Sequence, residues 1–188
     1  MLYSSIIVNR SRAIHGNGLF ATKLIRKGTL VWKLDEPTFT WKEIQAWSEK
    51  RLRDFKWYGF QCGVDRYSFP EDNSREWNHS CDPNTWWVGS NSLCARRDIL
   101  AGEEVTYDYS TCDIELEFEM KCHCGTPSCR DIITNRDYLK SQWQEQYGLN
   151  LPPHVLSAIE IAHKHNVYLF YSSKFQLMVK RIRGMLKK

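Results

Sequence analysis

Three closely spaced cysteines constrain this chain more than any other feature. Cys122, Cys124 and Cys129 fall within eight residues. In a reducing compartment such spacing is typical of a metal site rather than of a disulfide framework. A structural zinc ion takes four ligands, so the trio predicts one zinc ion and a fourth ligand from a distant segment. The candidates for that ligand are the remaining cysteines, Cys62, Cys81, Cys94 and Cys112. A set of metal-free thiols is the alternative interpretation.

The composition is that of a protein that works inside a cell. The first eight residues lack the basic start and long apolar run of a secretion signal. No apolar stretch approaches the roughly 20 residues of a membrane span. We therefore expect an intracellular protein, nuclear or cytoplasmic, with reduced cysteines and no membrane contact. A length of 188 residues, with 42% hydrophobic and 26% charged residues, fits one domain with an appended element.

Positive charge is concentrated at the end of the chain. The formal net charge is only +4, but residues 161–188 contain no acidic side chain. A solvated helix face with a basic tail is the simplest interpretation. Weak contact with nucleic acid through this tail is the second one.

The periodicity of apolar residues predicts a mainly β protein with helical additions, an α+β fold. Short β elements are expected at 6–8, 29–32, 92–99 and 105–107, separated by glycine turns. An amphipathic helix should begin after Thr40, which would form a capping box with Glu43. After Asn135 the pattern is helical, over the ranges 137–147, 154–167 and 172–185. We expect these helices to pack on the core through Trp143, Leu156, Ile159, Phe170 and Phe175.

Acidic and apolar residues alternate from Asp113 to Glu119. In an extended segment, a period of two would place four carboxylates on one edge. Such an edge could attract a basic peptide. A solvated surface strand is the simpler interpretation.

Four motifs in this order resemble those of the SET-domain protein lysine methyltransferases. They are the turn 16–18 (Gly-Asn-Gly), the segment 78–84 (Asn-His-Ser-Cys-Asp-Pro-Asn), the segment 102–109 (Gly-Glu-Glu-Val-Thr-Tyr-Asp-Tyr) and the cysteine trio. The resemblance covers about residues 5 to 133. It implies a SET-domain β-clip fold with a knot-like threading of the C-terminal segment. The expected divisions are a SET domain at 1–110, a post-SET zinc-binding segment at 111–133 and a helical extension at 134–188.

The resemblance also implies the site residues. Cys81 would close the zinc site with the late trio. Tyr109 corresponds to the essential tyrosine, and Tyr107 occupies the position that tunes how many methyl groups are added. S-adenosylmethionine would contact Gly16, Asn17, Gly18, Arg75, Asn78, His79 and Tyr109. The substrate would be a lysine-containing protein, either a histone or another basic protein.

The chemistry itself needs no catalytic metal or acid. Methyl transfer to lysine is a direct displacement that requires a neutral, desolvated and aligned amine. A phenol can position that amine, and a hydroxyl at Tyr107 can hold a water where a further methyl group would have to fit. We therefore expect mono- or dimethylation.

The chain departs from the family pattern at two places. The range 34–37 (Leu-Asp-Glu-Pro) stands where related enzymes carry a Tyr-x-Gly-Glu strand, so a second pocket tyrosine is missing. Trp32, Tyr58 or Tyr67 could fill its place. Glu76 and Trp77 replace an apolar pair beside the cofactor. An inactive peptide- or chromatin-binding module is therefore the alternative function, and a zinc-containing nucleic-acid binder is a remoter one.

Overall fold

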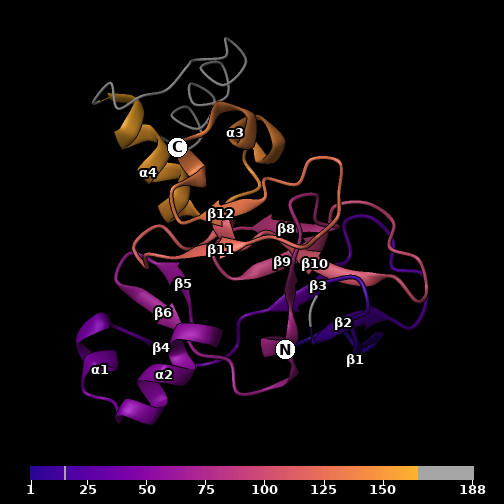
Figure 1. The fold of residues 1–188 in the computed structure, drawn as a ribbon, viewed down its shortest axis with the longest axis horizontal. Coiled ribbons are helices and arrows are strands. Elements are labelled where there is room, and N and C mark those ends of the chain that lie inside the picture. Colours follow the sequence, from indigo (N-terminus) through magenta and orange to yellow (C-terminus); the bar gives the residue numbers. More distant parts are fainter. Residues whose placement is uncertain (15, 165–188) are drawn as a thin grey trace, which may run out of the picture.

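The computed structural model describes residues 1–14 and 16–164, which form small sheets flanked by two groups of helices. Figure 1 shows α1 and α2 at one end of the molecule and α3 and α4 at the other, with the strands between them. The prediction of a mainly β fold with helical additions is confirmed. Within the described ranges no helix has the length and apolar character needed to cross a membrane.

A four-stranded sheet brings distant motifs side by side. Its order is β1 (Ile6–Arg10), β2 (Asn17–Ala21), β10 (Glu104–Tyr107) and β7 (Asn78–His79). β10 is antiparallel to β2 and parallel to β7, with Tyr107 opposite His79. The buried side chains of Leu19 and Val105 pack in the main core below this sheet. The Gly-Asn-Gly turn, the Asn-His pair and the late tyrosines thus meet in one place.

A second sheet completes the main core. It consists of β3 (Leu30–Lys33), β9 (Ser92–Ala95) and β8 (Thr85–Val88), all antiparallel. Trp32 and Trp87 contact each other edge to face with ring centroids 6.0 Å apart. Their large apolar surfaces account for much of the burial in this core.

An insertion between β3 and β7 forms a separate lobe. It contains the sheet β4 (Thr38–Phe39), β6 (Arg66–Ser68) and β5 (Phe60–Gly63), and the helices α1 (Trp41–Gln45) and α2 (Glu49–Tyr58). The predicted capping box at Thr40 is confirmed. The single helix expected after it is divided in two, because the Ser48 side chain accepts from Arg51 N and starts a second helix. A 3₁₀ turn, η1 (Asn73–Glu76), leads from the lobe to β7.

The helices described after residue 134 pack around an apolar cluster of their own. After the 3₁₀ turn η2 (Tyr109–Thr111) come the hairpin β11 (Glu119–Lys121) and β12 (Ile132–Thr134), then η3 (Asp137–Leu139), α3 (Ser141–Tyr147) and α4 (Pro153–Lys164). The helix predicted over 137–147 therefore begins as a separate 3₁₀ turn, and it ends at Gly148 as expected. Trp143, Leu156 and Ile159 do pack together. Phe170, Phe175 and the helix predicted over 172–185 lie outside the described residues.

Candidate active site

The side-chain amide of Asn78 joins strands β2, β7 and β10 through its hydrogen bonds. Asn78 Nδ2 donates to the carbonyl of Asn17 at 2.7 Å and to Glu104 Oε1 at 2.7 Å. Gly16 has a φ of +51°, and a Cβ at Gly18 would overlap the Glu104 carboxylate. Glycine at position 18 therefore lets β2 approach the Asn78 and Glu104 side chains closely.

His79 is a buried, neutral connector. Only 2% of it is exposed, and burial lowers its pKa to about 4. Its Nδ1 accepts from the backbone N–H of Tyr109 at 3.2 Å, and its Nε2 lies 3.3 Å from Cys81 Sγ. This bonding pattern assigns the proton to Nε2, which can then donate to the sulfur. His79 thus ties Tyr109 to the cysteine cluster.

Tyr107 and Tyr109 lie next to each other, with ring centroids 5.0 Å apart. The Tyr109 hydroxyl donates to the carbonyl of Trp77 at 2.5 Å, and the Trp77 indole packs edge to face on Tyr107. Burial raises the pKa of both phenols, so both are neutral at physiological pH. Trp77, a departure from the family pattern, therefore contacts both predicted catalytic residues.

The four predicted metal ligands meet. The sulfurs of Cys81, Cys122, Cys124 and Cys129 all lie within 4.8 Å of one another. Cys81 and Cys122 are 3.7 Å apart, close to the roughly 3.8 Å between thiolates around tetrahedral zinc. The backbone N–H of Arg130 donates to Cys81 Sγ at 3.4 Å, as amides commonly do around such sites. The cluster therefore fits a zinc ion, while Cys62, Cys94 and Cys112 lie outside it.

Burial bears on how the cluster would take up a metal ion. It raises the pKa of Cys81 to about 11, so this thiol does not ionise by itself near neutral pH. Zinc binds thiolates and would have to displace the proton.

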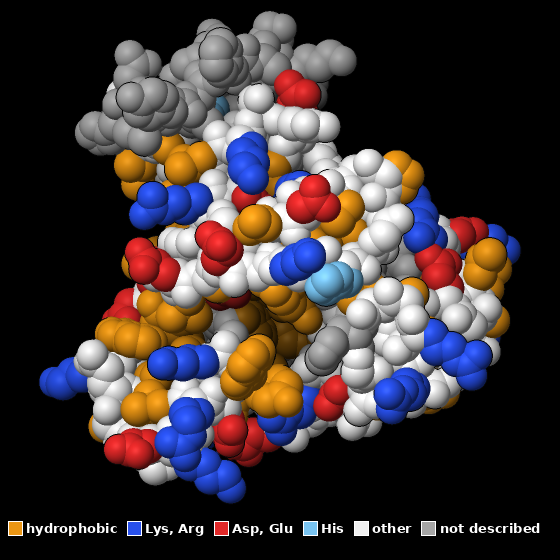
Figure 2. Space-filling view, viewed as in Figure 1, with side chains coloured by type: hydrophobic (Ala, Val, Ile, Leu, Met, Phe, Trp, Pro, Cys, Tyr) orange, Lys and Arg blue, Asp and Glu red, His pale blue; other side chains and the backbone are white. Residues whose placement is uncertain are grey.

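A cavity of about 850 Å³ opens between the insertion lobe and the segment 113–120. Figure 2 shows a hollow with hydrophobic side chains at its floor. Arg75, Tyr107 and Tyr109 line this cavity, whereas Gly16, Asn17, Gly18, Asn78 and His79 are not among its lining residues. All three candidates for the missing tyrosine, Trp32, Tyr58 and Tyr67, belong to the lining. The guanidinium of Arg75 stacks on the Tyr58 ring at 3.8 Å, which fixes the position of the cation.

The acidic segment forms part of the cavity wall. The extended strand predicted over 113–119 is wrong, because only Glu119 belongs to a strand. Gln61 instead clamps the start of the segment: its N–H donates to Asp113 Oδ1 at 2.6 Å, and its Oε1 accepts from the N–H groups of Ile114 and Glu115. All four acidic residues nevertheless line the cavity.

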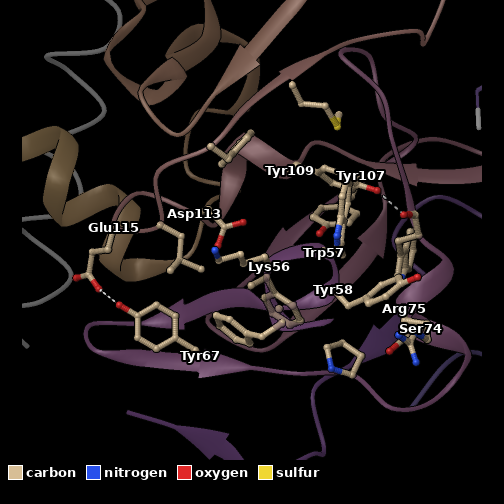
Figure 3. A pocket seen from close by; sticks show the side chains of 18 of the residues that line it. Lys56, Trp57, Tyr58, Tyr67, Ser74, Arg75, Tyr107, Tyr109, Asp113 and Glu115 are labelled. Atoms are coloured by element: carbon tan, nitrogen blue, oxygen red, sulfur yellow. Dashed lines mark hydrogen bonds between the residues drawn. The ribbon is translucent and has the colours of Figure 1, made fainter. Parts of the chain in front are cut away.

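Glu115 is held by a second contact from the insertion lobe. The Tyr67 hydroxyl donates to Glu115 Oε2 at 2.6 Å, as Figure 3 shows. The insertion lobe and the acidic segment therefore build one wall. The alternation of acidic and apolar residues over 113–119 predicted a row of carboxylates, but it did not predict that Gln61 would hold this segment in place.

Three buried polar groups of the cavity lining have no hydrogen-bond partner. They are Trp32 Nε1, Ser74 Oγ and Trp77 Nε1. Buried donors are normally satisfied, so these three favour an internal water as the missing partner. Sequence reasoning missed this feature, because neither indole nor hydroxyl burial follows from a local pattern.

This site, on this fold, is that of a SET domain. The SET domain family model matches residues 16–110, and the chain belongs to that family. It is 35% identical over 140 residues to "Histone-lysine N-methyltransferase, H3 lysine-36 specific" of Yarrowia lipolytica, covering 67% of this chain and 18% of that protein. It is 29% identical over 143 residues to "Histone-lysine N-methyltransferase ATX2" of Arabidopsis thaliana, covering 66% of this chain and 12% of that protein.

Two solved structures share the fold. KRYPTONITE, in complex with mCHG DNA and SAH, aligns with a TM-score of 0.52 and 22% identity over 68% of this chain and 28% of that one. The methyltransferase domain of human SETMAR aligns with a TM-score of 0.51 and 21% identity over 70% of this chain and 57% of that one. The chain spans less than a fifth of the length of the two curated relatives described above.

The residues present fit S-adenosylmethionine as the cofactor. A Cβ at Gly16 would meet no atom within 4 Å, so the turn before β2 borders open space. Neutral phenols and backbone carbonyls near Trp77 can accommodate a cationic sulfonium without a buried counter-charge. The residues that would hold it are Gly16, Asn17, Gly18, Arg75, Asn78 and His79, with Tyr109.

Proposed function

We propose that this protein transfers methyl groups from S-adenosylmethionine to a lysine of another protein. The observation that carries the proposal is the meeting of the two half-buried tyrosines, Tyr107 and Tyr109, at a large cavity, on the strand that pairs with the one following the Gly-Asn-Gly turn. The names of the relatives, which are histone-lysine methyltransferases, support it. A histone or another basic protein is the proposed substrate, and the histone-directed relatives support action in the nucleus.

The residues of the chain position the reacting groups and exclude water from them. When bound, S-adenosylmethionine supplies the methyl group on a sulfonium, whose carbon–sulfur bond breaks as the nitrogen–carbon bond forms. The lysine amine must first lose a proton to water, because its lone pair attacks the methyl carbon. The rings of Tyr107, Tyr109 and Trp77 wall the approach and exclude water from the reacting atoms. The bond from Tyr109 to the Trp77 carbonyl fixes the phenol before substrate arrives.

The cavity wall supports a basic, extended peptide as substrate. Glu115, Glu117 and Glu119 line one side, and Trp57, 84% exposed, stands on the other as a free aromatic surface. Among residues 1–14 and 16–164, β11 pairs only with β12, so its outer edge can accept a strand from the peptide. Carboxylates along that edge would attract lysine and arginine side chains.

The proposed product is mono- or dimethyllysine. Tyr107 carries a hydroxyl where phenylalanine would leave more room, and a water held by that hydroxyl would occupy the space of a further methyl group. Mass spectrometry of a methylated histone peptide should show no efficient trimethylation, and Tyr107→Phe should raise the methylation state. Efficient trimethylation by the unmodified protein would contradict this assignment.

The experiment that tests the activity uses labelled S-adenosylmethionine and a panel of purified core histones and non-histone basic proteins. Transfer to a lysine, located by mass spectrometry, is the expected result. Calorimetric titration of the same preparation with the cofactor gives the control. Tight cofactor binding with no transfer to any protein in the panel would instead favour the peptide-binding module. The missing Tyr-x-Gly-Glu strand is the observation that keeps this second function in view.

We also propose three divisions of the chain: a SET domain at 1–110, a post-SET segment at 111–133 and a helical extension at 134–188. The separate apolar clusters support the last boundary, because Trp143, Tyr147 and Val155 pack in a core of their own. Of the basic tail proposed for weak nucleic-acid contact, only residues 161–164 are described, at the end of α4, and the rest lies outside the described residues.

A further inference from the structure

A carboxylate buried between the two catalytic tyrosines connects them to the C-terminal extension. Asp108 follows Tyr107 and precedes Tyr109, and its side chain is fully buried. Its Oδ1 accepts from the backbone N–H of Ser110 at 3.1 Å, which fixes the first residues of η2. It also lies 3.4 Å from His79 Nδ1. The orientation of this one side chain therefore sets the backbone that carries both phenols.

Helix α3 supplies two of the donors that hold Asp108. The Tyr147 hydroxyl donates to Asp108 Oδ2 at 2.7 Å, and Trp143 Nε1 donates to the same oxygen at 3.2 Å. A third residue of the helix, Gln146, donates from Nε2 to the carbonyl of Cys81 at 2.8 Å. One face of α3 thus contacts both the carboxylate behind the tyrosines and the backbone of a cysteine in the thiol cluster. This helix lies outside the range 16–110 that matches the family.

Charges from two further segments complete the arrangement. Arg130 donates from Nη2 to Asp108 Oδ1 at 2.7 Å, and its Nε lies 3.3 Å from Asp137 Oδ2. Lys140 pairs with Asp137 at 2.7 Å. The hydrogen bonds from Arg130 and Tyr147 stabilise the charged form of Asp108 against the cost of its burial. Asp108 therefore accepts hydrogen bonds from α3, from Arg130 and from the backbone of Ser110.

We propose that α3 is a positioning element for methyl transfer, with Tyr147 and Trp143 as positioning residues. They orient Asp108, and Asp108 orients the Tyr107 and Tyr109 phenols. Misplacement of a reacting group by about 1 Å can reduce a rate on the order of 100-fold. Loss of one of several donors to Asp108 is a milder change. The role in catalysis rests on the proposed function, whereas the role in placing Tyr109 does not.

The test compares two variants that each remove one hydroxyl from the full-length chain. Tyr147→Phe removes the bond to Asp108 and keeps the ring. Tyr138→Phe is the matched control, because Tyr138 packs against the same apolar cluster and has no recorded bond to Asp108. We expect kcat for transfer to histone H3 to fall about tenfold in Tyr147→Phe, with KM and the cofactor Kd within twofold of the unmodified protein. Tyr138→Phe should leave all three constants unchanged.

A spectroscopic measurement separates this inference from the proposed function. Fluorotyrosine placed only at position 109 gives a ¹⁹F resonance that reports the phenol directly. Tyr147→Phe should shift or broaden this resonance, and Tyr138→Phe should not. If no substrate is methylated but the resonance responds, the proposed function fails and the positioning role stands. If Tyr147→Phe only lowers Tm while kcat or the resonance is unchanged, α3 is merely structural and the inference is overturned.

Discussion

The two sides of the Tyr107–Tyr109 segment differ in how their polar groups are satisfied. On the buried side, Asp108 accepts from α3, from Arg130 and from the backbone of Ser110. On the cavity side, Trp32 Nε1, Ser74 Oγ and Trp77 Nε1 are buried without a partner. Both oxygens of Asp108 have donors, although Nε and Nη1 of its partner Arg130 have no hydrogen-bond acceptor, whereas the three cavity-lining donors have no partner at all.

This difference suggests separate roles for the two sides in the proposed function, namely positioning of the phenols and recognition of the substrate. Satisfied buried networks are rigid, because moving any member leaves a polar group unpaired. Unsatisfied groups in a cavity cost free energy until a ligand or water pairs with them. The phenols are therefore held from behind, while recognition of the substrate is left to the open side.

Breaking the cysteine cluster should have the largest effect on the buried side. Cys122→Ser removes one of four ligands, and zinc bound per chain, measured by mass spectrometry or atomic absorption, should fall from one to near zero. Because metal binding free energy is folding free energy in such segments, the hairpin β11–β12 should lose protection from hydrogen exchange. Cys94→Ser is the control, since Cys94 lies outside the cluster. Full zinc occupancy in Cys122→Ser would contradict the four-thiolate site.

Removing the hydroxyl held at the junction of the two sides should have the next largest effect. Tyr109→Phe deletes the bond to the Trp77 carbonyl and the group that would orient the amine. We expect kcat to fall about 10²–10³-fold, as for other preorganised donors, with the cofactor Kd nearly unchanged. Steady-state kinetics and calorimetry measure the two quantities. A loss of cofactor binding equal to the loss of rate would assign Tyr109 to binding alone.

On the cavity side, Asp113 should make the free energy of unfolding depend on pH. Burial raises the pKa of Asp113 to about 7, above its value of about 3.9 in an unfolded chain. The stabilising contribution is then complete below pH 4 and is lost as pH rises through 7, because the unfolded chain releases this proton first. Between pH 5 and pH 8 the unmodified protein should lose about 2 kcal/mol of unfolding free energy relative to Asp113→Asn. Parallel denaturation profiles for the two proteins would show that Asp113 ionises normally.

A matched pair of serines gives the smallest and most direct comparison. Ser110→Ala removes a buried hydroxyl that donates to Asp137 Oδ2 at 3.2 Å and should cost about 1–2 kcal/mol of unfolding free energy. Ser74→Ala removes a buried hydroxyl that has no partner, so stability should not fall and should rise by up to about 1 kcal/mol. Urea denaturation of both variants measures the difference. Equal losses would mean that the two sides are satisfied to the same degree.

The sequence alone was sufficient to predict features that depend on residue type and on close spacing along the chain. The close cysteines required a fourth ligand, and the family resemblance selected Cys81, which the fold places with the trio. The capping box at Thr40 and the end of α3 at Gly148 followed from local chemistry alone. In each case the constraint lies within a few residues or in a fixed ligand number.

The rest depended on contacts between segments that no local pattern records. Gln61 looks like an ordinary strand residue, yet it clamps Asp113 and so converts a predicted solvated strand into a cavity wall. The partners of Asp108 come from positions up to 39 residues away. Ser48 divided the expected single helix because its cap outweighed the continuous amphipathic pattern.

The two ring nitrogens of His79 have a consequence for how the protein would respond to oxidative stress. One nitrogen faces the Cys81 sulfur and the other accepts from the amide of Tyr109. Oxidation of that sulfur to a sulfenic or sulfinic acid would place an oxygen beside Nε2 and so disturb the position of the imidazole and its bond to Tyr109. Damage at the thiols would therefore reach the proposed methyl-transfer site through a single aromatic ring.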